Sequence, residues 1–207
     1  MGEIILLRHG ETEWSRDGRH TGRTDVPLTA AGEQQARAAA AALAGRRIAA
    51  VWSSPAARAR RTAELAGLKP DGTDPDLWEW DYGGYEGLTT AEVRRRRPGW
   101  YLWTDGTVPG GPGGSPSETV EAVGERCDRV LSRVRPLVWP QSPDILDGDV
   151  VLVAHGHVLR VLAARWLGLP AAAGAYFKLD TASLSRLGFE HSRPVLSLWN
   201  HVPGGGV

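Results

Sequence analysis

Two apolar segments of this chain each run directly into a histidine. Residues 4–7 precede Arg8 and His9, and residues 150–154 precede His155. In an open α/β sheet, the carboxyl ends of the strands open onto the ligand crevice. A glycine follows each histidine and permits a tight backbone turn, and imidazole changes its charge near neutral pH. This combination indicates a site for chemistry on an anion, and phosphate is the anion that we expect.

Further residues that suit phosphate chemistry stand elsewhere in the chain. Arg58 follows a Ser-Pro pair at 54–55 that is typical of a helix start, so we expect it in or beside a first helical turn. A helix amino terminus favours anions, and an arginine fork matches two phosphate oxygens at once. Glu79, Asp81 and Glu86 are neighbouring acidic residues, of which Glu79 stands between Trp78 and Trp80, whose rings we expect to form an apolar wall that favours the protonated carboxyl.

The order of these pieces resembles the histidine phosphatase superfamily, which includes the cofactor-dependent phosphoglycerate mutases. The resemblance extends from about residue 4 to about residue 167. It is carried by the Arg-His-Gly-Glu-Thr stretch at 8–12, by Arg58, by the segment 79–87 and by His155 with its glycine. It implies an α/β fold, a three-layer sandwich in which a mostly parallel central sheet has helices on both faces.

The resemblance also implies a role for each of these residues. His9 is the implied nucleophile, a neutral imidazole that forms a phosphohistidine while a backbone carbonyl nearby holds its other ring nitrogen. Arg8 and Arg58 would clamp the phosphate, and His155, protonated when phosphate is bound, would be a third positive donor. Glu79 would give a proton to the leaving oxygen and then take one from the attacking water.

Three loop residues match positions that contact ligand in the family. Thr21 and Gly22 correspond to positions that touch the substrate beyond the transferred phosphate. Ser15 stands where many members have asparagine, and the implied contact there is to phosphate.

Phosphatases and mutases share the phosphohistidine and differ in what accepts the phosphoryl group. Mutases usually follow their acid with an arginine and carry a later Trp-Arg-Arg-Ser-Tyr type segment, whereas here Trp80 follows the acid and the nearest later stretch is an arginine run at 94–97. We therefore predict a phosphoric monoester hydrolase of the histidine acid phosphatase type, acting on small phosphorylated metabolites such as sugar phosphates or bisphosphates. The alternatives are a cofactor-dependent phosphoglycerate mutase and a non-catalytic phosphate-binding regulatory module.

Composition limits the class of partner. The 207 residues can build one substantial core, so we expect a single domain over 1–207. Basic and acidic residues number 24 each, which leaves no general field to attract nucleic acid or anionic membrane. The expected partner is a small phosphorylated substrate, and a homodimer stays open.

The single cysteine, the spacing of the histidines and the length of the apolar segments argue against a disulfide, a metal site and a membrane span. The single cysteine, Cys127, stands at helical spacing among valines and leucines, so we expect it in the core. The six histidines show no metal-ligand spacing, and we predict neither a metal nor another cofactor. The apolar runs are strand-sized and no signal peptide is visible at the start, so we expect a protein of the cytoplasm.

Hydrophobic periodicity predicts strands alternating with helices, as in a parallel sheet covered on both faces. We expect extended segments at 3–7, 48–52, 77–80, 150–154, 175–179, 182–189 and 194–200, some of the last three antiparallel. We expect helices at 29–43, 54–66, 89–97, 118–134 and 158–167, the first capped by Thr29 and the second by Ser54. The long loop at 8–27 is expected to be functional, and the glycine- and proline-rich segment 108–117 is a candidate hinge or lid.

Overall fold

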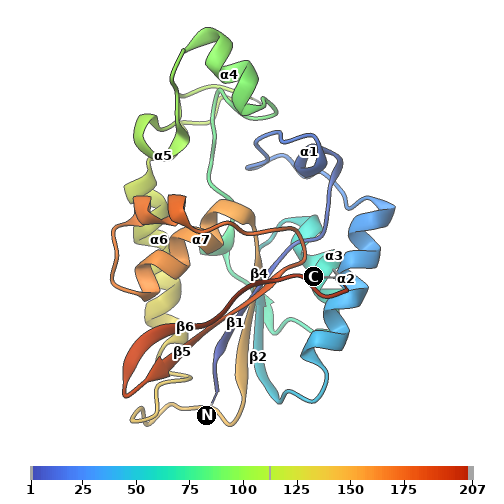
Figure 1. The fold of residues 1–207 in the computed structure, drawn as a ribbon, viewed down its shortest axis with the longest axis vertical. Coiled ribbons are helices and arrows are strands. Elements are labelled where there is room, and N and C mark those ends of the chain that lie inside the picture. Colours follow the sequence, from blue (N-terminus) through green and yellow to red (C-terminus); the bar gives the residue numbers. More distant parts are fainter. Residues whose placement is uncertain (1, 112, 205–207) are drawn as a thin grey trace.

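The apolar segments that precede the two histidines form neighbouring parallel strands at the centre of one sheet (Figure 1). The computed structural model of the chain describes residues 2–111 and 113–204. Its sheet has the order β3-β2-β4-β1-β5-β6. The strands are β1 (Ile4–Arg8), β2 (Ile48–Ser53), β3 (Gly72–Thr73), β4 (Asp149–Ala154), β5 (Leu184–Glu190) and β6 (Arg193–His201). The first four are parallel, β5 is antiparallel to β1, and β6 is antiparallel to β5.

The pairing of β1 with β4 decides where the histidines lie. Arg8 is opposite Ala154 in the parallel register, and the N–H of His9 donates to the carbonyl of Ala154 at 2.9 Å. His9 and His155 therefore leave the sheet side by side, at its carboxyl edge.

Two helical layers cover the sheet, which confirms the predicted three-layer fold. Helices α2 (Ala30–Leu43) and α3 (Ala57–Leu65) lie on one face, and α6 (Val120–Val134) and α7 (Gly156–Trp166) lie on the other (Figure 1). Alternate strand residues point to opposite faces. Ile5 and Leu7 pack in the core with α2 and α3, whereas Ile4 and Leu6 pack in the core with α6 and α7.

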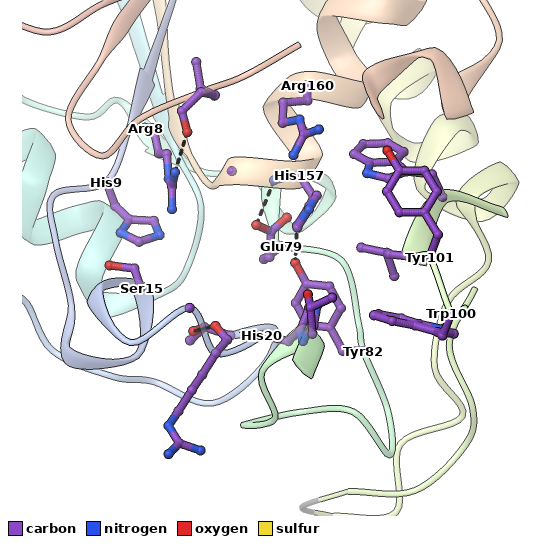
Figure 2. A pocket seen from close by; sticks show the side chains of 18 of the residues that line it. Arg8, His9, Ser15, His20, Glu79, Tyr82, Trp100, Tyr101, His157 and Arg160 are labelled. Carbon is purple, nitrogen blue, oxygen red and sulfur yellow. Dashed lines mark hydrogen bonds between the residues drawn. The ribbon is translucent and has the colours of Figure 1, made fainter. Parts of the chain in front are cut away.

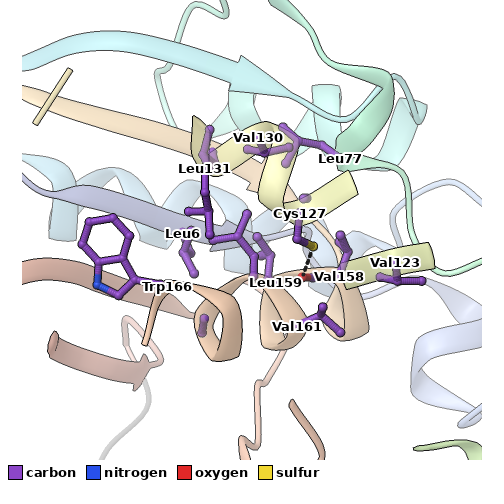
Figure 3. Packing of buried hydrophobic residues seen from close by; sticks show 14 of the residues in the cluster. Leu6, Leu77, Val123, Cys127, Val130, Leu131, Val158, Leu159, Val161 and Trp166 are labelled. Carbon is purple, nitrogen blue, oxygen red and sulfur yellow. Dashed lines mark hydrogen bonds between the residues drawn. The ribbon is translucent and has the colours of Figure 1, made fainter. Parts of the chain in front are cut away.

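The interface of α6 and α7 contains the single cysteine (Figure 3). Cys127 is fully buried, and its Sγ lies 3.6 Å from the carbonyl oxygen of Val158. Burial raises the pKa of this thiol to about 12. The prediction of a core cysteine is confirmed.

Short elements lie beyond the carboxyl edge of the sheet. Helices α1 (Glu13–Arg16), α4 (Thr90–Arg96) and α5 (Leu102–Asp105) lie past this edge in Figure 1. Two 3₁₀ helices, η1 (Pro75–Leu77) and η2 (Ala171–Tyr176), complete the elements. Of the described residues, no helix is long and apolar enough to cross a membrane.

The predicted caps are right at one helix and wrong at another. Thr29 caps α2, since its hydroxyl accepts the N–H of Gly32 at 2.9 Å. Helix α3 begins only at Ala57, whose N–H donates to the Asp25 carboxylate at 3.0 Å, and its N-cap residue Ala56 has no capping side chain. The Ser54 hydroxyl accepts the N–H of Ala56 at 3.3 Å and lies 2.7 Å from Nε2 of His155.

Two predicted extended segments are wrong. Residues 175–179 overlap η2 and form no strand. The carbonyls of Gly174 and Ala175 accept hydrogen bonds from Arg160 of α7 in place of strand pairing. Residues 77–80 follow η1 without a strand, because Arg126 takes the carbonyls of Asp76 and Trp78 at 2.8 and 2.6 Å. The loop 8–27 also contains α1, and β3 and α5 were not predicted.

The glycine- and proline-rich segment is fixed to the loop that follows Glu79. Short bridges pair Gly83 with Val108 and Gly110 with Ser115. Pro112, at the middle of this segment, lies outside the described residues.

Candidate active site

The carboxyl edge of the sheet opens onto a pocket of about 360 Å³ (Figure 2). Five of the predicted site residues line it: Arg8, His9, Ser15, Thr21 and Glu79. Arg58 and His155 are fully buried beside it, and the His155 ring centre lies 5.2 Å from that of His9.

His9 is held in a single tautomer. Its Nδ1 lies 2.7 Å from the carbonyl oxygen of Gly10, which can only accept, so the proton is on Nδ1 and the lone pair is on Nε2. Burial, with the positive charges of Arg58 and Arg8, lowers the pKa of His9 well below its usual value. The imidazole is therefore neutral, with a free nitrogen suited to attack phosphorus.

Arg58 joins α3 to the first loop. Its Nη1 donates to the carbonyl of Thr24 at 2.8 Å, and its Nη2 donates to those of Thr21 and Gly22 at 3.2 and 2.9 Å. Its Nε donates to Nδ1 of His155 at 3.1 Å. The side chain thus fixes the loop and supplies a buried positive charge beside both histidines.

His155 is bonded through both ring nitrogens, and its expected role as a positive donor to bound phosphate stays a prediction. Because its Nδ1 accepts from Arg58, its proton is on Nε2, which donates to the Ser54 hydroxyl. Burial and the charge of Arg58 lower the pKa of His155 well below its usual value. A neutral imidazole results.

Glu79 caps the helix that begins after His155. Its Oε2 accepts the N–H of His157 at 2.9 Å, and its Oε1 accepts those of Val158 and Trp80 at 2.8 and 2.9 Å. The sequence analysis did not predict these three backbone donors. Oε2, with one hydrogen bond, is the oxygen with capacity left for a proton or a ligand.

Arg8 has a buried donor without an acceptor. One of its amino groups donates to the carbonyl of Leu179, while its Nε has no hydrogen-bond partner among the described residues. Burial lowers the pKa of this guanidinium. Because an unsatisfied buried donor is costly, an anion at this point of the pocket would stabilise the arginine.

The sequence of the whole chain matches one family. The profile of the histidine phosphatase superfamily (branch 1) matches residues 4–202. An acid phosphatase of Mycobacterium tuberculosis is 40% identical over 203 residues, with 96% of this chain and 93% of that protein covered. The chain belongs to the histidine phosphatase superfamily.

Other relatives of this histidine phosphatase carry different names. Sedoheptulose 1,7-bisphosphatase of Saccharomyces cerevisiae is 36% identical, with 80% of this chain and 67% of that protein covered. "Probable phosphoglycerate mutase GpmB" of Salmonella choleraesuis is 32% identical, with 100% and 94% covered. The solved structure of an open reading frame product of Mycobacterium tuberculosis has a TM-score of 0.85 at 38% identity, covering 98% of each chain. The predictions of family, fold class and phosphoric monoester hydrolase are confirmed.

The three loop residues of this histidine phosphatase differ in position. Thr21 lines the pocket, and its carbonyl binds Arg58. Ser15 lines it too, but its hydroxyl already bonds the N–H and carbonyl of Thr12 in a capping box. Gly22 is not among the lining residues. Its N–H donates to both carboxylate oxygens of Glu86 at 2.9 Å.

The pocket of this histidine phosphatase also contains residues that the sequence analysis missed. They include His20, Tyr82, Trp100, Tyr101, Trp103, His157 and Arg160. Tyr82 lies in the segment 79–87, and its hydroxyl is 2.6 Å from Nδ1 of His157, two residues after His155. Tyr82 and His157 stand close in sequence to predicted site residues, which could have indicated them. The aromatic residues at 100–103 had no such signal. Among the described residues, no three histidine, cysteine or acidic side chains cluster as metal ligands would.

The buried histidines predict a loss of stability in acid. Burial lowers the pKa of His9, His155 and His157 well below the ordinary 6.5, so the unfolded chain binds more protons than the folded one once the pH falls below that value. Each such histidine removes up to about 1.4 kcal/mol of folding free energy per pH unit. Urea unfolding should therefore give a lower stability at pH 5.5 than at 7.5, with a smaller difference in His157→Gln. Equal or greater stability at the lower pH would contradict this account.

Proposed function

We propose that this chain hydrolyses phosphomonoesters of small metabolites through a phosphohistidine on His9. The observation that carries the proposal is the state of the His9 ring. The bond from Nδ1 to the Gly10 carbonyl orients the Nε2 lone pair, and the lowered pKa keeps the ring neutral even in mildly acidic solution. The substrate is a small molecule because the pocket, about 360 Å³, matches one.

The first step transfers the phosphoryl group to the enzyme. Nε2 of His9 attacks phosphorus as the bond to the leaving oxygen breaks. Arg8 and Arg58 supply fixed positive charge for the phosphoryl oxygens, and the unsatisfied Nε of Arg8 gains an acceptor. Glu79, protonated on Oε2, gives its proton to the leaving oxygen, so the alcohol departs neutral.

The second step returns the enzyme to its starting state. Water attacks phosphorus and gives a proton to the carboxylate of Glu79. The bond from phosphorus to Nε2 of His9 breaks, and inorganic phosphate leaves. The neutral His155, whose Nδ1 accepts from Arg58, positions that guanidinium throughout. Thr21, at the pocket wall, contacts the substrate beyond the phosphate.

Phosphate release from a panel of phosphomonoesters tests this function. We expect release from small substrates with water as the acceptor, and trapping of an acid-labile phosphoenzyme. A mutase would instead move the phosphoryl group between organic molecules with little free phosphate, and a binding module would bind phosphate without turnover. Either of those results, obtained over the whole panel, would overturn the proposal.

A further inference from the structure

A buried ion pair outside the pocket contacts the segment that carries Glu79. Arg126 lies on α6 and is only 4% exposed. Its Nε and Nη2 donate to the two carboxylate oxygens of Glu118 at 2.9 and 3.1 Å. Two parallel bonds of this kind fix the geometry of both side chains. Neither residue lines the pocket, so any effect of the pair on the reaction must act through other groups.

Arg126 binds the backbone on the amino-terminal side of Glu79. Its Nη1 donates to the carbonyl of Trp78 at 2.6 Å and to that of Asp76 at 2.8 Å. Trp78 directly precedes Glu79 in the chain, and residues 77–80 belong to no strand. The guanidinium therefore supplies bonds that a neighbouring strand would otherwise give to this segment.

Glu118 binds the backbone on the carboxyl-terminal side of Glu79. Its Oε2 accepts the N–H of Asp81 at 2.9 Å, and its own N–H donates to the carbonyl of Asp81 at 3.0 Å. Its carbonyl accepts the indole N–H of Trp80 at 2.9 Å. Glu79 thus lies between two anchored stretches of backbone, one bound to Arg126 and the other to Glu118.

The anchored backbone decides where the carboxyl group of Glu79 lies. A general acid must come within hydrogen-bond reach of the leaving oxygen, and a misplacement of about 1 Å can cost roughly 100-fold in rate. The opposite charges of Arg126 and Glu118 balance each other, so the pair holds this segment without adding net charge beside the acid. Precise placement of the Glu79 carboxyl is what the pair contributes.

We propose that Arg126 and Glu118 are positioning residues for the proton transfer, because they hold the backbone on both sides of Glu79 so that its carboxyl group reaches the leaving oxygen. This inference rests on the proposed function, in which Glu79 gives that oxygen its proton. Attack by His9 on phosphorus does not involve the pair. The pair therefore matters most for leaving groups that need a proton.

Arg126→Gln is the first test, measured as kcat for two substrates that differ in the leaving group. Glycerol 2-phosphate releases an alkoxide that needs a proton, whereas p-nitrophenolate leaves without one. We expect kcat for glycerol 2-phosphate to fall by roughly 10- to 100-fold, and kcat for p-nitrophenyl phosphate by less than about 3-fold. A loss of folded enzyme alone would lower both values by the same factor.

Arg129→Gln is the matched control from the same helix. Arg129 is exposed and donates to the carboxylate of Asp76 at 2.6 and 3.3 Å. Arg133 donates to that carboxylate too, at 2.9 Å, so Asp76 keeps a partner in the variant. The substitution removes an arginine that binds η1 but leaves the carbonyl bonds beside Glu79 intact. Both kcat values should therefore stay within about 2-fold of wild type.

Glu118→Gln tests the other half of the pair and remains available if Arg126→Gln does not fold. The Glu118 side chain is 18% exposed, and glutamine keeps one oxygen as an acceptor while it removes the charge and the second acceptor. We expect the same selective loss, with kcat for glycerol 2-phosphate roughly 3- to 30-fold lower and kcat for p-nitrophenyl phosphate little changed.

A combination with Glu79→Gln shows whether the pair acts through the acid. We take the ratio of kcat for glycerol 2-phosphate to kcat for p-nitrophenyl phosphate. In the Glu79→Gln background, adding Glu118→Gln should lower this ratio no further, because no acid is left to position. A structural effect independent of the acid would add to the loss caused by Glu79→Gln.

The outcomes separate this inference from the proposed function. An equal fall for both substrates in a folded Arg126→Gln or Glu118→Gln enzyme, or no fall at all, would overturn the positioning role and leave the hydrolase intact. A further fall of the ratio in the Glu79→Gln background would do the same. No hydrolysis of any substrate by the wild type would instead remove the proposed function, and this inference with it.

Discussion

His9→Ala is expected to lower the rate of phosphate release by at least about 10⁴-fold, because it removes the atom that accepts the phosphoryl group. The neighbouring His155 cannot take over. The ring of His155 is 5.2 Å away between centres, and both of its nitrogens are already bonded, to Arg58 and Ser54. The measurement is inorganic phosphate release by wild type and variant, with phosphoenzyme trapped from each.

Inorganic phosphate provides the control for His9→Ala. The alanine variant retains Arg8 and Arg58, so phosphate should still raise its melting temperature, which would show that the anion site is folded. At a phosphate concentration about 100 times Kd, the gain is about 2.7 kcal/mol. Turnover within about 10-fold of wild type in such a folded variant would exclude His9 as the nucleophile.

Glu79→Gln is expected to slow hydrolysis of alkyl phosphates by about 10²- to 10⁴-fold, the range of general acid catalysis. The effect should depend on the leaving group. The alkoxide of glycerol 2-phosphate needs a proton as it departs, whereas p-nitrophenolate is stable without one. We therefore expect kcat for p-nitrophenyl phosphate to fall much less than kcat for glycerol 2-phosphate. An equal fall for both substrates would contradict the role of Glu79 as acid.

A neighbouring carboxylate supplies the matched control. Glu86 accepts the N–H groups of Gly22 and Thr24, so Glu86→Gln should weaken the first loop and affect both leaving groups equally. Glu79→Gln also replaces one acceptor at the start of α7 with a donor, which should cost about 1–3 kcal/mol of folding free energy. Urea unfolding measures that loss separately from the rate.

The role of Glu79 as the acid stays a prediction, and the sequence did not anticipate the groups that meet its carboxylate. Glu79 lies at the pocket, as the resemblance implied. Its carboxylate accepts two N–H groups from the amino terminus of α7, almost 80 positions later in the chain, besides the N–H of Trp80. No local pattern reports such a contact, because it forms only when η1 and α7 pack on the same side of the sheet.

The sequence by itself predicted the main strands of the sheet, their order along the chain and the chemistry expected at its edge. Apolar periodicity and the positions of His9 and His155 are local features, and parallel strands bring their carboxyl ends together in any α/β sheet. Arg58 followed from the same kind of local signal, and it lies in the first turn of α3 as expected.

Only the tertiary structure decided which polar groups meet. It gave Ser54 to His155 in place of a helix end, turned the carbonyls of 174–175 toward Arg160, and set that arginine on Trp103. Hydrogen bonds and ion pairs act over a few ångströms between residues far apart in sequence, so their partners are fixed by packing and not by spacing along the chain. We expect the strand ends to position the phosphate chemistry and the packed helices and loops around them to select the rest of the substrate.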